Sequence, residues 1–410
     1  MNVLIISTSD INGGAAIAAF RLMNALRGRG LEVVMLVRDK RSGNERIIQA
    51  GSKIQNSLYF YGERGQIFLQ NRLSREDLFD VSIASTGVSV TGLPEFKRAD
   101  IIHLHWINQG MLSISEIGKI LASGKKVVWT MHDMWPFTGI CHYAGTCTRF
   151  HHSCGSCPYL KSLSENDLSY RIFRKKQATY ARGRIDFVAC SQWLGKLAEK
   201  SQLTNGHNVV SIPNPIDTGK YFPSDKTEAK QKLGLPTDKR IILFAAVKAS
   251  DKRKGMNYLI EAGKRINNKE VLFLIAGTNG DEIARQLPGL SVNAGFVASD
   301  KMPDFYNAAD VFVTPSLQDN LPNTLMEAMS CGTPCVGFNT GGIPEMIDHG
   351  KNGYVAEYRN AVDLANGLKW TLFEADSRLL SENAREKVLS EYAEEIIVNR
   401  YLTIYAEQPQ

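Results

Sequence analysis

The sequence predicts an α/β protein whose two domains are doubly wound parallel sheets. Short apolar segments alternate with helical patterns along nearly the whole chain, which is typical of parallel α/β layers. At 410 residues the chain is too long for one compact core, so two domains are expected. The expected strands form two groups, each large enough for a sheet of its own. They lie at residues 3–7, 32–37, 101–105, 126–131 and 186–190, and at residues 241–247, 271–277, 310–315 and 335–338.

The segment Ile212-Pro-Asn-Pro-Ile216 interrupts this alternation with two prolines and is the expected linker between the domains. We expect an N-terminal domain at residues 1–212 and a C-terminal domain at residues 213–390. A last helical segment at residues 391–410 is expected to pack back on the N-terminal domain. Doubly wound sheets bind ligands at the carboxyl ends of their strands. Two such sheets facing each other would therefore enclose the functional site in a cleft.

Composition and charge exclude several classes of protein. The apolar fraction of 43% and the charged fraction of 22% are ordinary for a globular protein. No apolar run reaches the roughly 18 residues of a membrane-spanning helix, and the first residues do not resemble a signal peptide. We therefore expect a cytoplasmic protein. The net charge of +6 is too modest to indicate a nucleic-acid partner.

Basic residues cluster in the segment from Tyr170 to Arg184. One interpretation is a solvated helix face, the usual position of such charge runs. The other is a surface that rests on anionic lipid head groups, because aromatic side chains lie between the cations. The second interpretation would place the protein at the inner face of the plasma membrane.

Two carboxylates, Asp319 and Glu327, stand eight positions apart across an expected strand-to-helix junction. Asp319 lies on the turn, and Glu327 lies in a helix expected over residues 323–329. Pro322 near the start of this helix and Gly332 just past its end are typical of helix termini. Unpaired N–H groups at a helix start favour an anion. The arrangement suits a ligand with a central phosphate and hydroxyls at both ends, such as a nucleotide sugar.

Other candidate residues also follow expected strands. Gly13 and Gly14 open a helix and would let a ligand approach the backbone, although a tight turn explains them equally well. His132 ends a strand, where its near-neutral pKa would let it donate or accept hydrogen bonds, although a lone histidine is more often structural. Lys248 and Lys254 belong to a loop with four cations, which is either solvated or neutralises a diphosphate.

Four of the seven cysteines lie within one short segment, at Cys141, Cys147, Cys154 and Cys157. The last two have the Cys-x-x-Cys spacing that a zinc ion accepts, and the first two would complete a tetrahedral site. Three histidines of the segment are alternative ligands: His142, His151 and His152. In a cytosolic protein a metal is favoured over disulfides, and free or redox-sensitive thiols are the alternative. A closed four-thiolate site would be structural, with no open position for catalysis, so this metal is not expected to be a cofactor of the reaction.

The segment from Ser316 to Phe338 resembles the motif of the large retaining GT-B glycosyltransferase family often called group 1, or family 4. Glu327 matches the second glutamate of its Glu-x7-Glu motif, and Asp319 stands where the first is expected. Similar segments elsewhere are Ile212-Pro-Asn-Pro-Ile-Asp217, Lys254-Gly255, Gly341-Gly-Ile-Pro-Glu345, Asn352-Gly-Tyr354 and, more loosely, Gly13-Gly14 and His132-Asp133. The cysteine-bearing insertion resembles a subgroup found in capsule and exopolysaccharide clusters.

The resemblance implies roles for the two acids and their neighbours. Glu327 would hold the ribose hydroxyls of the nucleotide. Asp319, with the amides of Asn320 and Leu321, would hold the donor sugar and phosphate. Asp319 is one methylene shorter than the glutamate usual in the family, which changes its reach toward the sugar.

The resemblance also implies roles for the cations and the histidine. Lys248 and Lys254 would stabilise the departing diphosphate, and His132 would contact the sugar near the reacting carbon. The usual family spacing of the basic pair leaves four residues between its members, whereas five separate Lys248 from Lys254. Lys252 and Arg253 are therefore further candidates for the first cation.

The resemblance predicts transfer of a hexose from a UDP- or GDP-sugar to a sugar hydroxyl of a growing, lipid-linked polysaccharide, with retention of configuration. One alternative is a nucleotide-sugar epimerase of the same fold, which would change the sugar without an acceptor. The other is a non-catalytic module that binds a nucleotide sugar or zinc. The sugar, the base, the acceptor and the oligomeric state are not revealed by the sequence.

Overall fold

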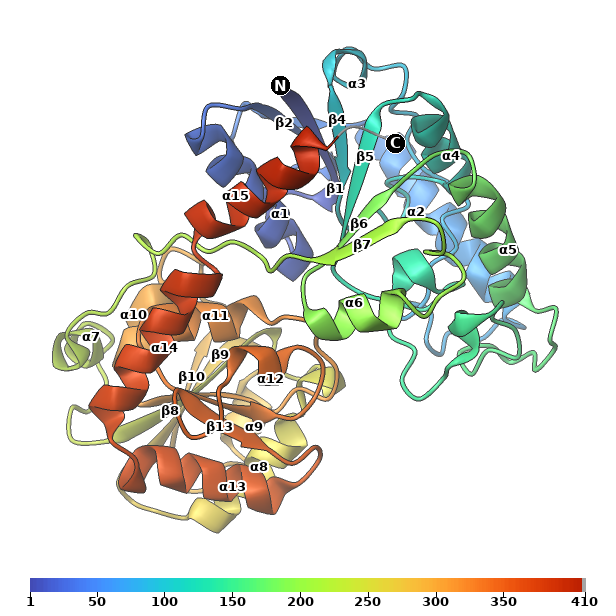
Figure 1. Cartoon of the computed structure of the whole chain (residues 1–410). Coiled ribbons are helices and arrows are strands. Elements are labelled where there is room, and N and C mark those ends of the chain that lie inside the picture. Colours follow the sequence, from blue (N-terminus) through green and yellow to red (C-terminus); the bar gives the residue numbers. More distant parts are fainter. Residues whose placement is uncertain (408–410) are drawn as a thin grey trace. The chain divides into compact units, whose positions relative to one another are not determined.

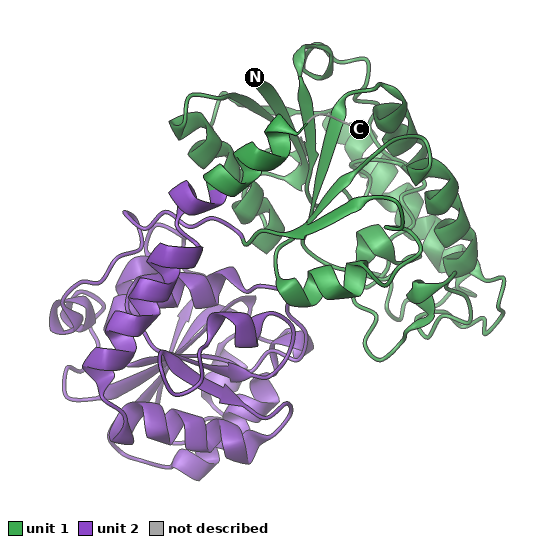
Figure 2. Cartoon of the chain, viewed as in Figure 1, with its two compact units in different colours: residues 1–213, 398–410 green, residues 214–397 purple. Residues whose placement is uncertain are grey.

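The computed structural model describes residues 1–407 and divides the chain into two compact units (Figure 2). Unit 1 comprises residues 1–213 together with the chain from residue 398 onward, and unit 2 comprises residues 214–397. The division after Pro213 falls within the proline-containing segment 212–216. The second unit ends seven residues later than residue 390, the expected end of the C-terminal domain.

Unit 1 contains a sheet of seven parallel strands in the order β3-β2-β1-β4-β5-β6-β7. Along the chain the strands are β1 (Asn2–Ser9), β2 (Glu32–Asp39), β3 (Ile47–Gln49), β4 (Ile101–Leu104), β5 (Lys126–Met131), β6 (Asp186–Ala189) and β7 (Asn208–Ser211). The central strands are buried almost throughout, as expected for a parallel sheet covered on both faces. The order reverses between β1 and β4, which creates a switch point at the carboxyl ends of these strands.

Helices cover both faces of the unit 1 sheet (Figure 1). They are α1 (Gly14–Gly28), α2 (Lys53–Gln70), α3 (Pro94–Arg98), α4 (Ile114–Ala122), α5 (Leu168–Tyr180), α6 (Gln192–Ala198) and the larger part of α15 (Glu394–Ala406), whose first residues belong to unit 2, with the 3-10 turns η1 (Trp135–Phe137) and η2 (Arg149–His151). Four helices begin at a short polar residue whose side chain accepts a bond from a first-turn N–H: Ser52, Ser113, Asp167 and Ser191. These caps set the helix starts.

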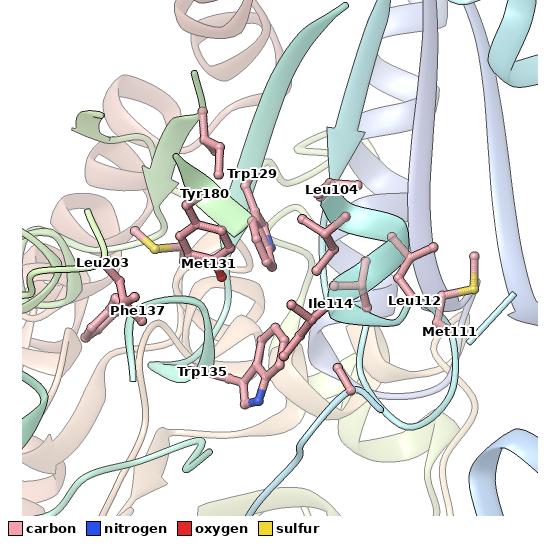
Figure 3. Close-up of a cluster of buried hydrophobic side chains, with 14 of the residues drawn as sticks. Leu104, Met111, Leu112, Ile114, Trp129, Met131, Trp135, Phe137, Tyr180 and Leu203 are labelled. Atoms are coloured by element: carbon pink, nitrogen blue, oxygen red, sulfur yellow. The ribbon is translucent and has the colours of Figure 1, made fainter. Parts of the chain in front are cut away.

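Aromatic and aliphatic side chains pack together in the core of unit 1 beside β5 (Figure 3). The ring of Trp129 lies 6.1 Å from that of Trp135 and 5.9 Å from that of Tyr180, between ring centroids. Trp129 belongs to β5, Trp135 to the nearby 3-10 turn η1 and Tyr180 to helix α5, so the cluster joins β5 and η1 to a helix that is distant in sequence.

The C-terminal helix α15 is attached to unit 1 through two buried tyrosines. The Tyr405 hydroxyl lies 2.6 Å from Nδ1 of His103, and the Tyr401 hydroxyl lies 2.8 Å from Oγ1 of Thr130. Nε2 of His103 lies 2.7 Å from the same Thr130 hydroxyl, which closes the network. Polar groups from β4, β5 and α15 therefore satisfy one another inside the core.

Unit 2 contains a sheet of six parallel strands in the order β10-β9-β8-β11-β12-β13. The strands are β8 (Arg240–Lys248), β9 (Val271–Thr278), β10 (Leu290–Gly295), β11 (Val311–Thr314), β12 (Cys335–Phe338) and β13 (Gly353–Ala356). The order reverses between β8 and β11, so unit 2 has a switch point of the same kind.

The helices of unit 2 include the one predicted behind Asp319. They are α7 (Lys226–Lys232), α8 (Met256–Ile266), α9 (Asp281–Ala284), α10 (Met302–Ala308), α11 (Asn323–Ser330), α12 (Ile343–Met346), α13 (Ala361–Lys369) and α14 (Ser377–Glu391), with the 3-10 turn η3 (Lys252–Lys254) and a π-helical turn η4 (Trp370–Glu374). Helix α11 starts one residue after Pro322, which is its N-cap rather than its first helical residue.

The predicted fold class is confirmed, since each unit is a doubly wound parallel sheet. Four strands were not expected from the sequence: β3, β7, β10 and β13. These strands lie at the edges of the sheets, and several of their side chains are partly exposed, so they lack the apolar runs that mark central strands. Among residues 1–407 no helix is long and apolar enough to cross a membrane.

We predict that Tyr405→Phe destabilises unit 1. The substitution removes the hydroxyl next to buried His103, and an unsatisfied buried polar group costs about 1–3 kcal/mol. The thermal unfolding midpoint of the variant is therefore expected to fall. Tyr61→Phe is the control, because Tyr61 is 70% exposed. Equal midpoints for both variants would contradict the anchoring role of α15.

Candidate functional site

Three loops meet at the carboxyl ends of β8, β11 and β12 in unit 2. The N–H of Leu317, after β11, donates to the carbonyl of Arg253, after β8, over 2.7 Å. The N–H of Gly342, after β12, donates to the carbonyl of Asn320 over 2.8 Å. The loop after β11 is thus bound on both sides, at the edge where a doubly wound sheet binds its ligand.

Two glycines permit this close approach of the loops. Gly255 has a φ of +69°, and a Cβ there would lie 1.8 Å from the carbonyl oxygen of Pro315. Gly341 has a φ of +58°, and its Cβ would lie 1.7 Å from the carbonyl oxygen of Asp319. Neither the backbone angle nor the space admits a side chain at these positions. The close contacts between the loops therefore explain why the Lys-Gly and Gly-Gly segments have glycine at positions 255 and 341.

The switch point of unit 2 contains an ion pair between two predicted site residues. Nζ of Lys254 lies 2.6 Å from Oδ2 of Asp319. Lys254 follows β8 and Asp319 follows β11, the two strands between which the order reverses. The side chains are 31% and 15% exposed, respectively, so an incoming anion has access to the lysine. Lys248 ends β8 on the surface and makes no ion pair with any described residue.

The predicted helix start lies directly behind this pair. Helix α11 begins at Asn323, and no side chain of its N-cap residue bonds to its first turn. Asn320 and Leu321, on the turn before it, are 4% and 6% exposed. The positive end of the helix dipole therefore lies near the Lys254–Asp319 pair, and the helix start and the ammonium of Lys254 both attract a negatively charged ligand.

Glu327 is oriented by a tyrosine that the sequence did not reveal. Its Oε2 accepts a 2.8 Å bond from the hydroxyl of Tyr306, which comes from α10 and is fully buried. Burial, and then the charge of Glu327, hold the pKa of Tyr306 well above its ordinary value, so the hydroxyl stays a donor. Tyr306 lies outside every motif, and only its apolar surroundings on a short helix mark it in the sequence.

In unit 1, Gly13 and Gly14 form the turn from β1 into α1 beside the switch point. Gly13 has a φ of +94° and is the N-cap of α1, without a side-chain cap bond. A Cβ at Gly13 would meet nothing within 4 Å, so backbone conformation rather than space favours glycine there. Asp10, which follows β1, accepts a 2.8 Å bond from the N–H of Ser42 and so joins this loop to the loop after β2.

His132 follows β5 as predicted, but its pKa differs from the expected near-neutral value. Burial lowers the pKa to about 4, with the charge of Asp133 acting in the opposite direction. His132 is therefore neutral at physiological pH. Its Nε2 lies 2.9 Å from Nδ1 of buried His105, a second residue that the sequence did not assign to the site.

Asp133, next to His132, is the centre of a buried network. Its Oδ2 lies 2.7 Å from Nδ1 of His142 and accepts a 2.8 Å bond from the indole of Trp106. Nε2 of His142 lies 3.0 Å from the hydroxyl of Ser82, which is fully buried. Both ring nitrogens of His142 thus have protein partners. This arrangement does not support His142 as a metal ligand.

The four clustered cysteines all line one small cavity of about 20 Å³ in unit 1, space for one water-sized particle. Their thiols are free, and burial raises the pKa of Cys154 to about 12 and that of Cys157 to about 11. Within residues 1–407 no three histidine, cysteine or acidic side chains are grouped so that they could hold a metal ion. The structural zinc therefore stays a prediction that would require the thiols to approach one another.

Lys176, in the basic segment of the sequence, is fully buried. Its ammonium donates to the carbonyls of Trp135 and Thr138 over 2.6 and 2.9 Å. It also lies 3.3 Å from the centroid of the Trp135 ring. Lys176 is therefore not part of a solvated or lipid-facing surface, unlike its basic neighbours.

Each unit is Rossmann-like and has a helix start at its switch point. The chain is therefore a two-domain α/β protein. Residues 12–220 match the family described as Glycosyltransferase Family 4, and residues 239–373 match Glycosyl transferases group 1. The first match covers about half of the chain. The chain belongs to glycosyltransferase family 4.

Individual relatives are distant and are matched in part. N-acetyl-alpha-D-glucosaminyl L-malate synthase of Bacillus anthracis is 28% identical over 48% of this chain and 53% of its own length. The N,N'-diacetylbacillosaminyl-diphospho-undecaprenol alpha-1,3-N-acetylgalactosaminyltransferase of Campylobacter jejuni is 29% identical over 46% of this chain and 52% of its own length. The chain thus spans about half the length of these relatives.

A solved structure matches the whole chain. Anabaena HepE, in complex with UDP-glucose, has a TM-score of 0.65 and 16% identity, over 98% of this chain and 100% of its own. At this identity the likeness concerns the fold alone. It supports the GT-B fold class.

We predict that Gly341→Ala disrupts the site, whereas Gly289→Ala does not. Both glycines have positive φ, at +58° and +73°, so both variants incur similar backbone strain of about 1–2 kcal/mol. Only at position 341 would the new Cβ meet a carbonyl oxygen; at 289 nothing lies within 4 Å. The unfolding midpoint should therefore fall further for Gly341→Ala. Equal midpoints would show that the loops are not in tight contact.

We predict that the purified protein contains about one zinc ion per chain, bound by the cysteine cavity. Cys154→Ala should lose the metal, and Cys331→Ala, at a buried cysteine of unit 2, should retain it. The zinc content of each protein is measured by elemental mass spectrometry after dialysis. A metal-free wild type, or unchanged content in Cys154→Ala, leaves free thiols as the correct interpretation.

Proposed function

We propose that this chain is a retaining glycosyltransferase that moves a hexose from a nucleotide sugar to a sugar hydroxyl. Family membership supports the transfer reaction. The Lys254–Asp319 pair at the switch point of unit 2 is the observation that carries the donor site. A UDP-sugar is the proposed donor, because HepE, which shares the fold, is known in complex with UDP-glucose.

In the proposed complex the loop after β11 and helix α11 hold the donor. Glu327, held by Tyr306, accepts bonds from the ribose hydroxyls. Asp319 and the N–H groups of Asn320 and Leu321 hold the sugar and its phosphate. The diphosphate competes with Asp319 for Lys254, so donor binding frees the Asp319 carboxylate to accept a bond from a sugar hydroxyl.

The proposed transfer needs stabilisation of charge more than a nucleophilic side chain. The bond between the sugar carbon and the phosphate oxygen breaks, and its electron pair stays on the departing diphosphate. Lys254 and Lys248 stabilise that charge, with help from the start of α11. The acceptor oxygen forms the new bond on the face that the diphosphate leaves, and its proton passes to a departing phosphate oxygen. We propose no cofactor for this step.

Unit 1 contributes a neutral histidine and a glycine turn in this proposal. His132 contacts the sugar near the reacting carbon as an uncharged group, and His105 sets its orientation. Gly13 and Gly14 present the start of α1, where a ligand can approach the backbone closely.

The proposed acceptor is a growing, lipid-linked oligosaccharide of a capsule or exopolysaccharide. The name of the Campylobacter relative specifies a sugar acceptor on diphospho-undecaprenol. A transferase that acts on such a substrate works at a membrane surface, which would place this protein at the inner face of the plasma membrane.

We predict that UDP raises the unfolding midpoint of the wild type and that GDP, ADP and CMP raise it less. A ligand at about 100 times its dissociation constant adds about 2.7 kcal/mol to stability. Glu327→Gln and Tyr306→Phe should both weaken the shift, because the first removes the carboxylate and the second its donor. Glu374→Gln, at an exposed position, is the control. No shift with any nucleotide would contradict the donor site.

We predict that Lys254→Ala lowers kcat by about 10²–10³, the usual effect of removing one group that stabilises transition-state charge. Lys264→Ala, at an exposed position on α8, should leave kcat unchanged. The rate is measured as nucleotide release from the donor with a sugar acceptor at saturation. Unchanged kcat in Lys254→Ala would mean that another cation stabilises the charge of the departing diphosphate.

The same assay separates the alternatives. An epimerase would alter the donor sugar in the absence of an acceptor, which analysis of the products reveals. A non-catalytic module would give a melting shift with the nucleotide yet no product with any donor and acceptor. Either result would replace the transferase proposal.

A further inference from the structure

Helix α2 (Lys53–Gln70) has an inverted distribution of side chains. A surface helix normally buries its apolar face and exposes its polar one. Three of the four buried residues of α2 are polar or charged: Asn56, Glu63 and Arg64, with Ile67 as the fourth. Four large apolar residues are instead exposed: Ile54 by 77%, Leu58 by 68%, Tyr61 by 70% and Leu69 by 67%.

These four exposed residues, here called the α2 stripe, lie on one face of the helix. Their positions differ by four, seven and fifteen from Ile54, and Gly65 fills the place between Tyr61 and Leu69. Such spacing aligns side chains along a helix. At 1.5 Å per residue the stripe is about 22 Å long. An apolar face of this length is unusual on a surface without a partner.

Polar contacts on the opposite face hold the stripe outward. Oε1 of Glu63 accepts bonds from the N–H groups of Ile83 and Ala84 over 2.8 and 2.9 Å. Arg64 donates to the carbonyl of Val81 over 2.9 Å. Rotation of α2 to bury the stripe would break these bonds, and a charge buried without its partner is costly. The fold therefore presents the stripe to the outside.

Cations gather at one end of the stripe. Arg171, at the start of α5, donates to the side chain of Gln70, at the end of α2, over 3.2 Å. Figure 1 shows α2 and α5 on the same side of unit 1. Arg171, Arg174 and Lys175 are exposed, and α5 (Leu168–Tyr180) contains no acid. The exposed residues of α2 include no acid either, so these cations lack a partner of opposite charge on the two helices.

We propose that the α2 stripe and the cations Arg171, Arg174 and Lys175 dock unit 1 on a bilayer with anionic head groups. The apolar side chains enter the boundary between head groups and acyl chains, with Tyr61 at that boundary, as in interfacial helices. The cations bind lipid phosphates and other anionic head groups. An acidic lipid surface fits better than a second copy of the chain, because neither helix offers an exposed acid to these cations.

This inference extends the proposed function to the surface on which the acceptor resides, and it does not depend on the donor site. It also divides the basic segment of the sequence into two parts. The outward cations of α5 take part in docking, while Lys176 belongs to the core.

The test is sedimentation of the full chain with vesicles of phosphatidylcholine, alone or mixed with phosphatidylglycerol. The wild type should bind the mixed vesicles and not the neutral ones. Leu58→Ser with Leu69→Ser should lower the partition coefficient about tenfold or more. The matched control is Leu379→Ser with Leu389→Ser on α14 of unit 2, where both leucines are also exposed.

A second pair of variants tests the charges. Arg174→Glu with Lys175→Glu should lower the partition coefficient about tenfold or more, and high salt should weaken the binding of the wild type. Lys264→Glu with Arg265→Glu, another exposed neighbouring pair, is the control on α8. Circular dichroism and the melting shift with UDP establish that each variant is folded and that the donor site is unaffected.

Three outcomes would overturn the proposal. The first is a wild type that does not bind anionic vesicles, and the second is equal binding by the stripe variant and its control. The third is a wild-type dimer, seen by light scattering after gel filtration, that the stripe variant converts to a monomer without any vesicle binding. That result would make the stripe a subunit interface. Loss of the UDP shift with vesicle binding intact would instead count against the donor site alone.

Discussion

The reversal of strand order within each parallel sheet is the constraint on which the sites of this protein depend. Parallel strands all end at one edge, so every loop that follows a strand lies on the same side of its sheet. Where the order reverses, neighbouring strands lead to helices on opposite faces, which leaves room between their loops. In unit 2 this position lies between β8 and β11, and it holds Lys254 and Asp319. Each half of the ion pair comes from one side of the reversal.

Pairs of buried polar groups set the orientation of side chains and of one helix around the two sheets. Tyr306 directs the carboxylate of Glu327, and His105 directs the imidazole of His132. The buried carboxylate of Glu63 likewise holds one face of α2 inward. In each case, leaving the buried polar group without its partner would cost more free energy than the hydrogen bond contributes. The orientation of the side chain is therefore specific. The candidate site residues are therefore oriented by buried partners that lie outside the motifs.

Much of the fold was accessible from the sequence, and the misses share one cause. Central strands are buried on both faces and appear as apolar runs, whereas β3, β7, β10 and β13 lie at sheet edges or have exposed side chains. The glycines and acids of the candidate site were predicted from the sequence because a turn and a helix start need those residue types locally. Tyr306 was not found, because its role exists only through a contact across 21 residues.

The sequence by itself determined the alternation of strands and helices and the candidate site residues that local motifs mark. Local patterns suffice for these features, since burial and turn geometry act within a few residues. Only the tertiary structure decided the ion pair of Lys254 with Asp319, the low pKa of His132 and the outward apolar face of α2. These features depend on which groups packing brings together and removes from water, and neighbours in space are not neighbours in the chain.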